Sequence, residues 1–588
     1  MRKMTTNSLT RAVAALGVAV VAAACQDLEV ENLNDPDREL ALDREDDVEL
    51  LGQKAWVPYY DRTSRQGNPN RLIQSMTREA TTTVGNNQAW PLGAAEPRER
   101  IHNDAVSEDH TPIRWLWYGL YEGYSNANEV LWAINERDPG MVFEDDEGED
   151  YTHMVEAWAH FNRGLTLGKI GKTFDRAYIV DYDDDMEDMA TFELEPWQNV
   201  IDFAYENHQQ VIELTEQHDF VLPGHVPGEG ESGGYMFERD VTSDMLNRYA
   251  HTHSAFLLAY GPRSPDQLDQ VDWNQVLHHA ERGLQVDSFA ARTGSDYLGR
   301  SNYRMRLSGS GNWMGVSYWT LGFSDIAGNF QDWLSAGVHD KRRFVLESAD
   351  ARIHPPGNPE PSFSDKNFSK KIRESEDETI QYFRYHTSLD IGSSWRVRGE
   401  YLGTFYPYFR GYDIWNENGW NFGGRWDRHV PLWTPYELDL LRAEAYLHLG
   451  QTGPALEIIN DFRWRGDLPP IEDPNAPVPH SAPGADDCVP RTLQGDCGDI
   501  WDALWWERDL ELMGLRAYRA WADHRRSGTL LCGSLEHFPV PARELQSAPI
   551  QEIYTFGGAG REEGTASAPD CIDPVDPLSG PDVGPGGS

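Results

Sequence analysis

The residues best suited to binding chemistry lie in a glycine-rich segment, GYDIWNENGWNFGGRWDR, at positions 411–428. Aromatic rings stack on the apolar C–H faces of sugars, while amides and guanidinium groups hydrogen-bond to the hydroxyls, so this mixture favours capture of an oligosaccharide. We expect one or two of the rings to contact ligand and the others to fill a seam between loops and helices. The candidate ligand-binding residues are Trp415, Trp420, Trp426, Asn416, Asn418, Asn421 and Arg425, with Trp313 and Trp319 from an aromatic cluster earlier in the chain.

The sequence contains no convincing catalytic motif. His251 and His253, and also His278 and His279, lack the H-E-x-x-H spacing of zinc enzymes, and a helical histidine more often packs in a core. A chain this rich in carboxylates places some pair at glycosidase spacing by chance, so carboxylate content does not indicate hydrolysis. We therefore expect a protein that is not an enzyme.

One acidic run could hold a metal ion. In DYDDDMED, at positions 181–188, the carboxylates of Asp181, Asp183 and Asp185 alternate as calcium ligands can. The run lacks the turn glycine and the final glutamate of a calcium-binding loop, so a solvated acidic loop is the favoured interpretation. A structural calcium ion on these three aspartates is the one cofactor that the sequence suggests.

Four of the five cysteines lie in the C-terminal fifth of the chain, as expected for disulfides in an oxidising compartment. Three pairings are possible. Cys488 and Cys497 share one insert rich in proline and glycine, so we favour Cys488 with Cys497, which leaves Cys532 with Cys571. A zinc site is the alternative, but neither C-x-x-C spacing nor a fitting histidine pair accompanies these cysteines.

A helical hairpin at positions 434–466 is the clearest element that could support a binding site. Thr434 and Glu437 match a capping box, with proline at the first helical position between them. Leucine and alanine then recur at helical spacing up to Gly450, where the first helix ends. Glu437 and Glu444 fall outside this apolar pattern and are expected to stay solvated.

Helical periodicity also runs through the N-terminal half of the chain. Aromatic residues at helical spacing there are expected to pack in a core. Together with the hairpin, these segments make about four helix-turn-helix pairs, the pattern of tetratricopeptide-like repeats, so the predicted fold is mainly α. The predicted helical segments are 43–78, 111–135, 151–172, 191–216, 242–260 and 273–284.

Between residues 286 and 433 the periodicity fades, while Gly, Ser, Asn, Pro and aromatic residues increase. We expect a loop-rich, aromatic-rich layer over the helical scaffold, because loops on a rigid scaffold commonly carry binding residues. The predicted helical repeats at about 43–285 and 434–526 flank this region within one body, 25–550. An irregular, partly disordered tail follows at 551–588.

The chain is strongly acidic. Its 588 residues include 51 Lys and Arg against 96 Asp and Glu, for a net charge of −45. A field of that sign repels phosphate backbones, so binding to nucleic acid is excluded as a function. A solvated surface suited to salty surroundings accounts for the excess of carboxylates.

Residues 1–24 resemble a lipoprotein signal peptide, with a basic start and an apolar run too short to span a bilayer. Three alanines directly precede Cys25, as in a bacterial lipobox, so Cys25 is the predicted lipidation site. Ordinary secretion with cleavage nearby is the alternative. No other stretch is long and apolar enough to cross a membrane, so we expect the lipid alone to hold the body there.

Arg508, Asp509, Leu510, Gly514 and Arg516 form one motif near the C-terminal end, and a second consists of Phe538, Pro539, Pro541 and Glu544. They resemble the R-E-L-x-x-E-G-x-R and F-P-I-P-x-x-E motifs of SusD/RagB-type outer-membrane nutrient-binding lipoproteins. Asp509 stands where that family usually has glutamate, and Met513 where an acidic residue commonly precedes the glycine. The family's usual aspartate falls on Arg519, with Asp523 the nearest candidate.

The resemblance implies a function in nutrient uptake. Such a lipoprotein sits on the cell outer membrane and faces the extracellular medium. It caps a SusC-like TonB-dependent barrel, to which it delivers an oligosaccharide or a peptide. Two alternatives from other classes are a secreted surface glycan hydrolase and a helical-repeat scaffold that binds only protein. The ligand stays open, because loops rather than the scaffold determine it.

Overall fold

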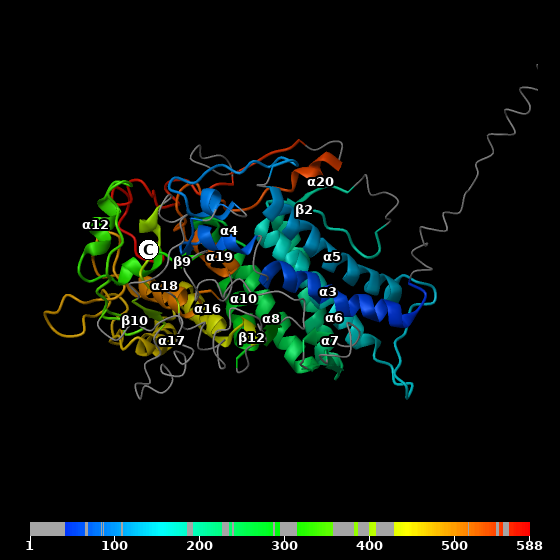
Figure 1. Cartoon of the computed structure of the whole chain (residues 1–588). Helices are drawn as coiled ribbons and strands as arrows, with labels where there is room; N and C mark the ends of the chain where they lie inside the picture. Colours follow the sequence, from blue (N-terminus) through cyan, green and yellow to red (C-terminus); the bar gives the residue numbers. More distant parts are fainter. Residues whose placement is uncertain are drawn as a thin grey trace, which may run out of the picture. The chain divides into compact units, whose positions relative to one another are not determined.

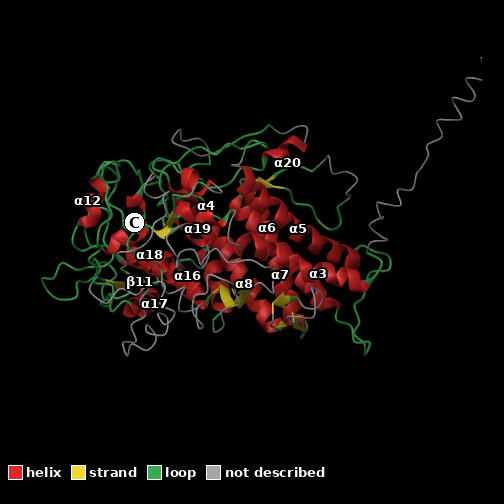
Figure 2. Cartoon of the chain, in the orientation of Figure 1, coloured by secondary structure: helices red, strands yellow, loops and turns green. Residues whose placement is uncertain are grey.

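The computed structural model describes residues 42–64, 69–83, 85, 88–107, 110–184, 192–225, 235–237, 240–285, 289–293, 314–356, 382–385, 399–406, 408, 428–514, 517–547, 552–556 and 564–587. The chain divides into two compact units, Met1–Asp47 and Val48–Ser588. The helices and strands that position the candidate sites lie in the second unit. Helices dominate it, as the predicted mainly α fold requires (Figures 1 and 2).

The long helices fall close to the predicted segments, and short helices lie between and after them. The helices are α3 (Glu45–Ser64), α4 (Asn70–Met76), η2 (Ala89–Ala94), α5 (His110–Asn135), α6 (Thr152–Thr173), α7 (Trp197–Gln217), α8 (Ser243–Tyr260), α9 (Pro265–Leu268), α10 (Trp273–Arg282), α11 (Tyr318–Leu321), η5 (Gly322–Ser324), α12 (Asn329–Ser335), η6 (Glu400–Leu402), α16 (Pro435–His448), α17 (Thr452–Arg465), α18 (Ile500–Glu511), α19 (Ala517–Arg526) and α20 (Ala542–Ser547).

The strands are short and pair two by two. The antiparallel pairs are β1 (Ala80–Thr81) with β9 (Gly315–Val316), β2 (Arg176–Ala177) with β3 (Glu195–Pro196), β4 (Val221–Leu222) with β7 (Val241–Thr242), and β8 (Phe289–Thr293) with β12 (Arg428–Trp433). The parallel pairs are β5 (Gly224–His225) with β6 (Met236–Phe237), and β10 (Ile353–His354) with β11 (Phe383–Arg384).

The helices pack as a consecutive array, in the order α5, α6, α7, α8, α10, α16 and α17 (Figure 1). Each pair buries a face that it cannot cover alone, which is the property of tetratricopeptide-like repeats. Helix α6 lies inside the array and is buried on nearly every side. A Cβ atom on its Gly168 would lie 2.6 Å from a Leu257 methyl group of α8, so glycine permits this close approach.

The loop-rich region packs a core of its own against α18. Its buried members are mostly aromatic, and Trp506, Leu510 and Met513 join the cluster from α18 and its C-terminal end. The remaining members come from other parts of the chain and are Ala80, Leu468, Val489, Leu493, Leu531 and Ile572. The predicted aromatic layer is therefore present where the structure describes it. Its buried rings are Tyr318, Trp319, Phe323, Phe330, Trp333, Tyr382, Phe383, Tyr406 and Tyr408.

Helix α18 carries a buried arginine that joins three other helices. Arg508 donates to Glu444 of α16 at 3.0 Å, to Asp523 of α19 at 2.9 Å, and to the Tyr260 hydroxyl of α8 at 3.1 Å. Arg526 also contacts Glu444 and Asp523. Burial disfavours the Asp523 carboxylate, but Arg508, Arg526 and Arg519 hold its pKa well below the usual range.

A second buried arginine joins α18 to the loop-rich region. Arg352 contacts Asp350, Glu507 and Glu511, at 2.6, 2.6 and 3.0 Å, and all four side chains are fully buried. Burial would lower the pKa of the Arg352 guanidinium, but Asp350 and Glu507 raise it well above its ordinary value. The group therefore stays charged, and α18 is tied by ion pairs to both the helical array and the aromatic layer.

The structure corrects two predictions for the 434–466 hairpin. Glu437 and Glu444 are not solvated: their exposed fractions are 2% and 0%. Glu444 pairs with Arg508 and Arg526, while Glu437 accepts from Tyr260. No side-chain cap forms at Thr434, so the capping box is also wrong, although proline does occupy the first turn.

Replacing Arg508 with methionine should destabilise the protein strongly, because Glu444 and Asp523 would lose a partner while staying buried. We expect a loss of about 3–5 kcal/mol in the free energy of unfolding, measured by urea denaturation. Arg248 is the matched control, since its pair with Asp244 is exposed. Methionine at position 248 should cost under about 1 kcal/mol. Equal losses in the two variants would contradict the role of Arg508.

Asp523→Asn should make the protein less sensitive to acid. A carboxyl whose pKa is depressed by folding contributes stability above its ordinary pKa of 3.8, and this contribution is lost as the pH falls through the folded value. The free energy of unfolding should be higher for the parent than for the variant, and this difference should be about 1 kcal/mol smaller at pH 3 than at pH 6. Urea denaturation at both pH values measures it. A difference that does not change with pH would show that Asp523 is not an ion-paired carboxylate.

Candidate ligand-binding site

Eight of the nine predicted ligand-binding residues lie outside the described residues. Their role in ligand binding stays a prediction. They are Trp313, Trp415, Asn416, Asn418, Trp420, Asn421, Arg425 and Trp426.

Trp319, the ninth, is described and lies in the core, with an exposed fraction of 3%. Its indole Nε1 donates to Glu96 Oε1 at 2.8 Å, and Phe330 and Trp333 pack against its ring. The Lys341 ammonium lies 3.6 Å from the same carboxylate. Trp319 therefore fills the seam between loops and helices, the alternative that the sequence left open, and offers no free face to a ligand here.

A pocket with exposed aromatic rings lies instead on the N-terminal half of α5. Trp115 and Tyr118 project from that helix with exposed fractions of 37% and 44%. The pocket has a volume of about 270 Å³. Its lining comes from α3, α5 and α20 and consists of Arg62, Arg114, Trp115, Tyr118, Gly119, Glu122 and Arg543.

Arginine and aromatic groups are held together in this pocket. The Arg62 guanidinium lies 5.0 Å from the centre of the Trp115 ring, a cation–π distance, and Arg62 also pairs with Asp61. Position 119 must be glycine for this arrangement, because the Arg62 side chain occupies the place where a Cβ atom of residue 119 would lie. Burial and the Glu544 carboxylate together raise the pKa of Tyr118 to about 12, so its hydroxyl stays protonated.

The pocket can therefore offer an aromatic surface together with arginine and carboxylate groups. Rings of this kind stack on apolar faces. Arginine donates hydrogen bonds to hydroxyl or carboxylate groups of a ligand, and glutamate accepts hydrogen bonds from its hydroxyls. Its volume lies just below the range for drug-sized ligands, so it suits one unit of a longer oligomer.

This pocket is not among the predictions from the sequence, because aromatic residues at helical spacing are expected to pack in the core. Trp117 and Tyr124 are indeed buried, and the hydroxyls of Tyr121 and Tyr124 donate to the carbonyls of Tyr178 and Val180. Trp115 and Tyr118 are three positions apart and share another face of the helix. Both residues lie off the apolar stripe of the helix, and this position in the sequence indicates that their rings are exposed.

The predicted calcium ligands do not converge within the described residues. Asp181 pairs with Arg163, and its amide donates to the Asp184 carboxylate at 2.7 Å. Asp183 is exposed, and Asp185 lies outside the described residues. A calcium ion on this run stays a prediction.

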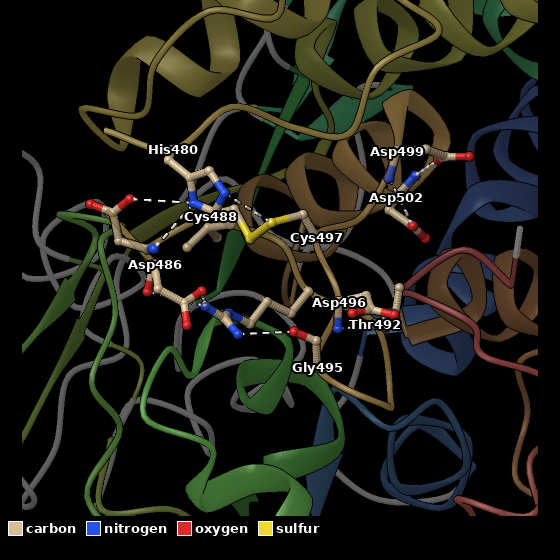
Figure 3. The surroundings of a disulfide bond; sticks show 12 residues. His480, Asp486, Cys488, Thr492, Gly495, Asp496, Cys497, Asp499 and Asp502 are labelled. Atoms are coloured by element: carbon tan, nitrogen blue, oxygen red, sulfur yellow. Dashed lines mark hydrogen bonds and ion pairs between the residues drawn. A yellow bond between two sulfur atoms is a disulfide. The ribbon is translucent and has the colours of Figure 1, made fainter. Parts of the chain in front are cut away.

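Both favoured disulfides are present. Cys488 is bonded to Cys497, and Cys532 to Cys571. Figure 3 shows His480 beside the first disulfide, with its Nε2 atom 3.7 Å from the Cys497 sulfur. Because the two sulfurs are bonded to each other, they are not available as thiolate ligands, and this arrangement is not a zinc site.

The predicted signal peptide, residues 1–24, and the predicted lipidation site, Cys25, lie outside the described part of the chain. None of the helices that the structure describes combines the length and the apolar character needed to cross a membrane.

Comparison with known proteins identifies the fold. No family profile and no curated protein matches this sequence. Among solved structures, a SusD superfamily protein from Parabacteroides distasonis is similar, with a TM-score of 0.52 and 13% identity over 86% of this chain and 98% of that one. A SusD-like protein from Bacteroides fragilis has a TM-score of 0.49 and 13% identity over 89% and 98%.

The first of these similarities shows that the chain has a SusD-like fold, made of tetratricopeptide-like helices with a loop-rich layer. The mainly α, tetratricopeptide-like fold predicted from the sequence is thereby confirmed.

Proposed function

We propose that this protein is a surface-exposed, lipid-anchored binding protein that captures a nutrient oligomer, an oligosaccharide or a peptide, at the outer membrane. It delivers the intact ligand to a SusC-like TonB-dependent transporter. The observation that carries this proposal is the SusD-like fold, which covers 86% of the chain and 98% of its structural neighbour. The Cys25 lipid and the transporter are proposed from the sequence motifs.

The pocket on α5 supports a binding function. A chain with a net charge of −45 exposes few large apolar side chains within the described residues, yet two aromatic ones, Trp115 and Tyr118, share one helix face. They lie beside Arg62, Arg114 and a carboxylate, the combination that fixes a sugar ring by stacking and hydrogen bonds. We propose that one sugar unit occupies this pocket.

The glycine-rich segment at 411–428 is the proposed second contact region. Several weak contacts along one oligomer increase affinity together, because each later contact is intramolecular once the first has formed. Delivery to a transporter requires the ligand to leave unchanged, so binding without chemistry is sufficient. No described group needs to act as a nucleophile or a general base.

Replacing Trp115 with alanine should weaken binding of an oligosaccharide that the parent protein binds. Loss of one stacking partner is worth about 0.5–1.5 kcal/mol, so Kd should rise up to about tenfold. Affinity electrophoresis against a panel of plant, algal and host polysaccharides identifies the binder, and calorimetry with its oligosaccharides measures Kd. Trp464 is the matched control, since it is 78% exposed on α17, away from the pocket. Alanine there should leave Kd unchanged.

The outcomes separate the alternatives. Recovery of the oligosaccharide intact after prolonged incubation is expected, whereas release of shorter products would show a hydrolase. If no polysaccharide or peptide mixture binds to the purified chain, the capture function is contradicted. A helical-repeat scaffold that binds only protein would then be favoured. Binding that is lost equally in the Trp115→Ala and Trp464→Ala variants would exclude the pocket but not the function.

A further inference from the structure

Three histidines from two neighbouring helices converge near one point on the array. His251 comes from α8, while His278 and His279 are consecutive residues of α10. One ring nitrogen from each lies within 4.8 Å of the other two. The Nδ1 atoms of His251 and His279 are 2.8 Å apart, and both rings are buried, whereas His278 is exposed.

A tyrosine orients one of the buried rings. The Tyr205 hydroxyl of α7 lies 2.8 Å from Nε2 of His279, on the side of the ring away from His251. If Nε2 carries the proton and donates to that hydroxyl, Nδ1 of His279 presents a lone pair toward the other two rings. A metal-binding histidine is commonly fixed in this way, with its second nitrogen held by a neighbouring polar group.

We propose that His251, His278 and His279 bind a divalent transition metal of the zinc class, with solvent as a fourth ligand. Three imidazoles with one open position match the donor set of zinc sites that keep a water ligand. Calcium and magnesium prefer oxygen ligands and do not suit this site, whereas zinc, copper and nickel do.

The geometry requires only small adjustments. Ligand nitrogens in a tetrahedral zinc site are about 3.4 Å apart, so the two buried Nδ1 atoms must separate by about 0.6 Å. The exposed His278 ring can rotate to complete the site and leaves a path for the ion. Arg282, a cation whose charge acts on both buried rings, donates to the His278 carbonyl at 2.9 Å, so that oxygen holds its guanidinium.

The short distance between the two buried Nδ1 atoms also has an explanation that needs no metal. A neutral pair without metal can share one N–H···N hydrogen bond, which is the competing explanation for the short distance. A hydrogen-bonded pair of His251 and His279 does not involve His278. Substitution of this exposed residue therefore distinguishes a metal site from such a pair.

The second cluster of metal-type side chains in the described part of the chain is His480 with Cys488 and Cys497. Its sulfurs are bonded to each other, so it competes for metal only after reduction. The test therefore uses the oxidised protein. A metal ion bound between α8 and α10 would cross-link two consecutive helices of the array and raise the thermal stability of the whole unit.

Zinc titration of the metal-free, disulfide-bonded protein, followed by calorimetry and thermal unfolding, tests the proposal. We expect one equivalent of Zn²⁺ to bind and to raise Tm. Cobalt in its place should give the visible absorption of a tetrahedral site with nitrogen ligands. His278→Ala should weaken zinc binding at least tenfold without changing the Tm of the metal-free protein, because the residue is exposed. His279→Gln should abolish the cobalt spectrum.

His339→Ala is the control, since His339 is exposed and lies outside the cluster. It should leave zinc affinity and the cobalt spectrum unchanged. The proposal is overturned if the parent protein binds no zinc at micromolar concentrations, or if His278→Ala binds zinc as tightly as the parent. Either result would leave the buried rings as a hydrogen-bonded pair.

Discussion

The buried ion pairs of α18 are the interaction on which the rest of the structure depends. Arg508 connects this helix to α8, α16 and α19, and its neighbour Glu507 connects it to Arg352 of the loop-rich region. A buried charge is costly without its partner, so each of these groups requires the others to be in place. The helical array and the aromatic layer are thus held in one arrangement by charges on successive residues of a single helix.

This arrangement separates the supporting helices from the residues that are proposed to bind ligand. Helices α5 to α8, α10 and α16 bury their faces against one another, so they form a rigid surface from which other groups project. Within the described residues, the exposed aromatic groups at Trp115 and Tyr118 stand on that surface and not in its core. Loops and exposed faces can then vary with the ligand while α18 and its partners keep the fold.

Most of the helical fold could be predicted from sequence because it depends on local periodicity. The segments 111–135, 151–172 and 242–260 correspond to α5, α6 and α8 within a residue or two. The burial of Glu444 could not be predicted in this way, since it depends on Arg508 and Arg526, which are remote in sequence. Periodicity assigns a carboxylate to solvent by default, and only the tertiary partner reverses that assignment.

The candidate site was less predictable, for a similar reason. Composition identified aromatic residues that could bind sugar, but composition does not separate an exposed ring from a buried one. Trp319 proved to be buried with its indole hydrogen-bonded to Glu96, and Trp115 proved to be exposed. The two cysteine pairs were predictable, because only three pairings exist and one of them joins Cys488 to Cys497, which are close in sequence.

The most direct test of the proposed function is to extract the protein gently from the membranes of its native cells and to identify by mass spectrometry what copurifies. A capture protein that delivers its ligand inward should bring with it a large TonB-dependent barrel in stoichiometric amount. Recovery of the protein alone, under conditions that preserve other outer-membrane complexes, would contradict a role in delivery to a transporter.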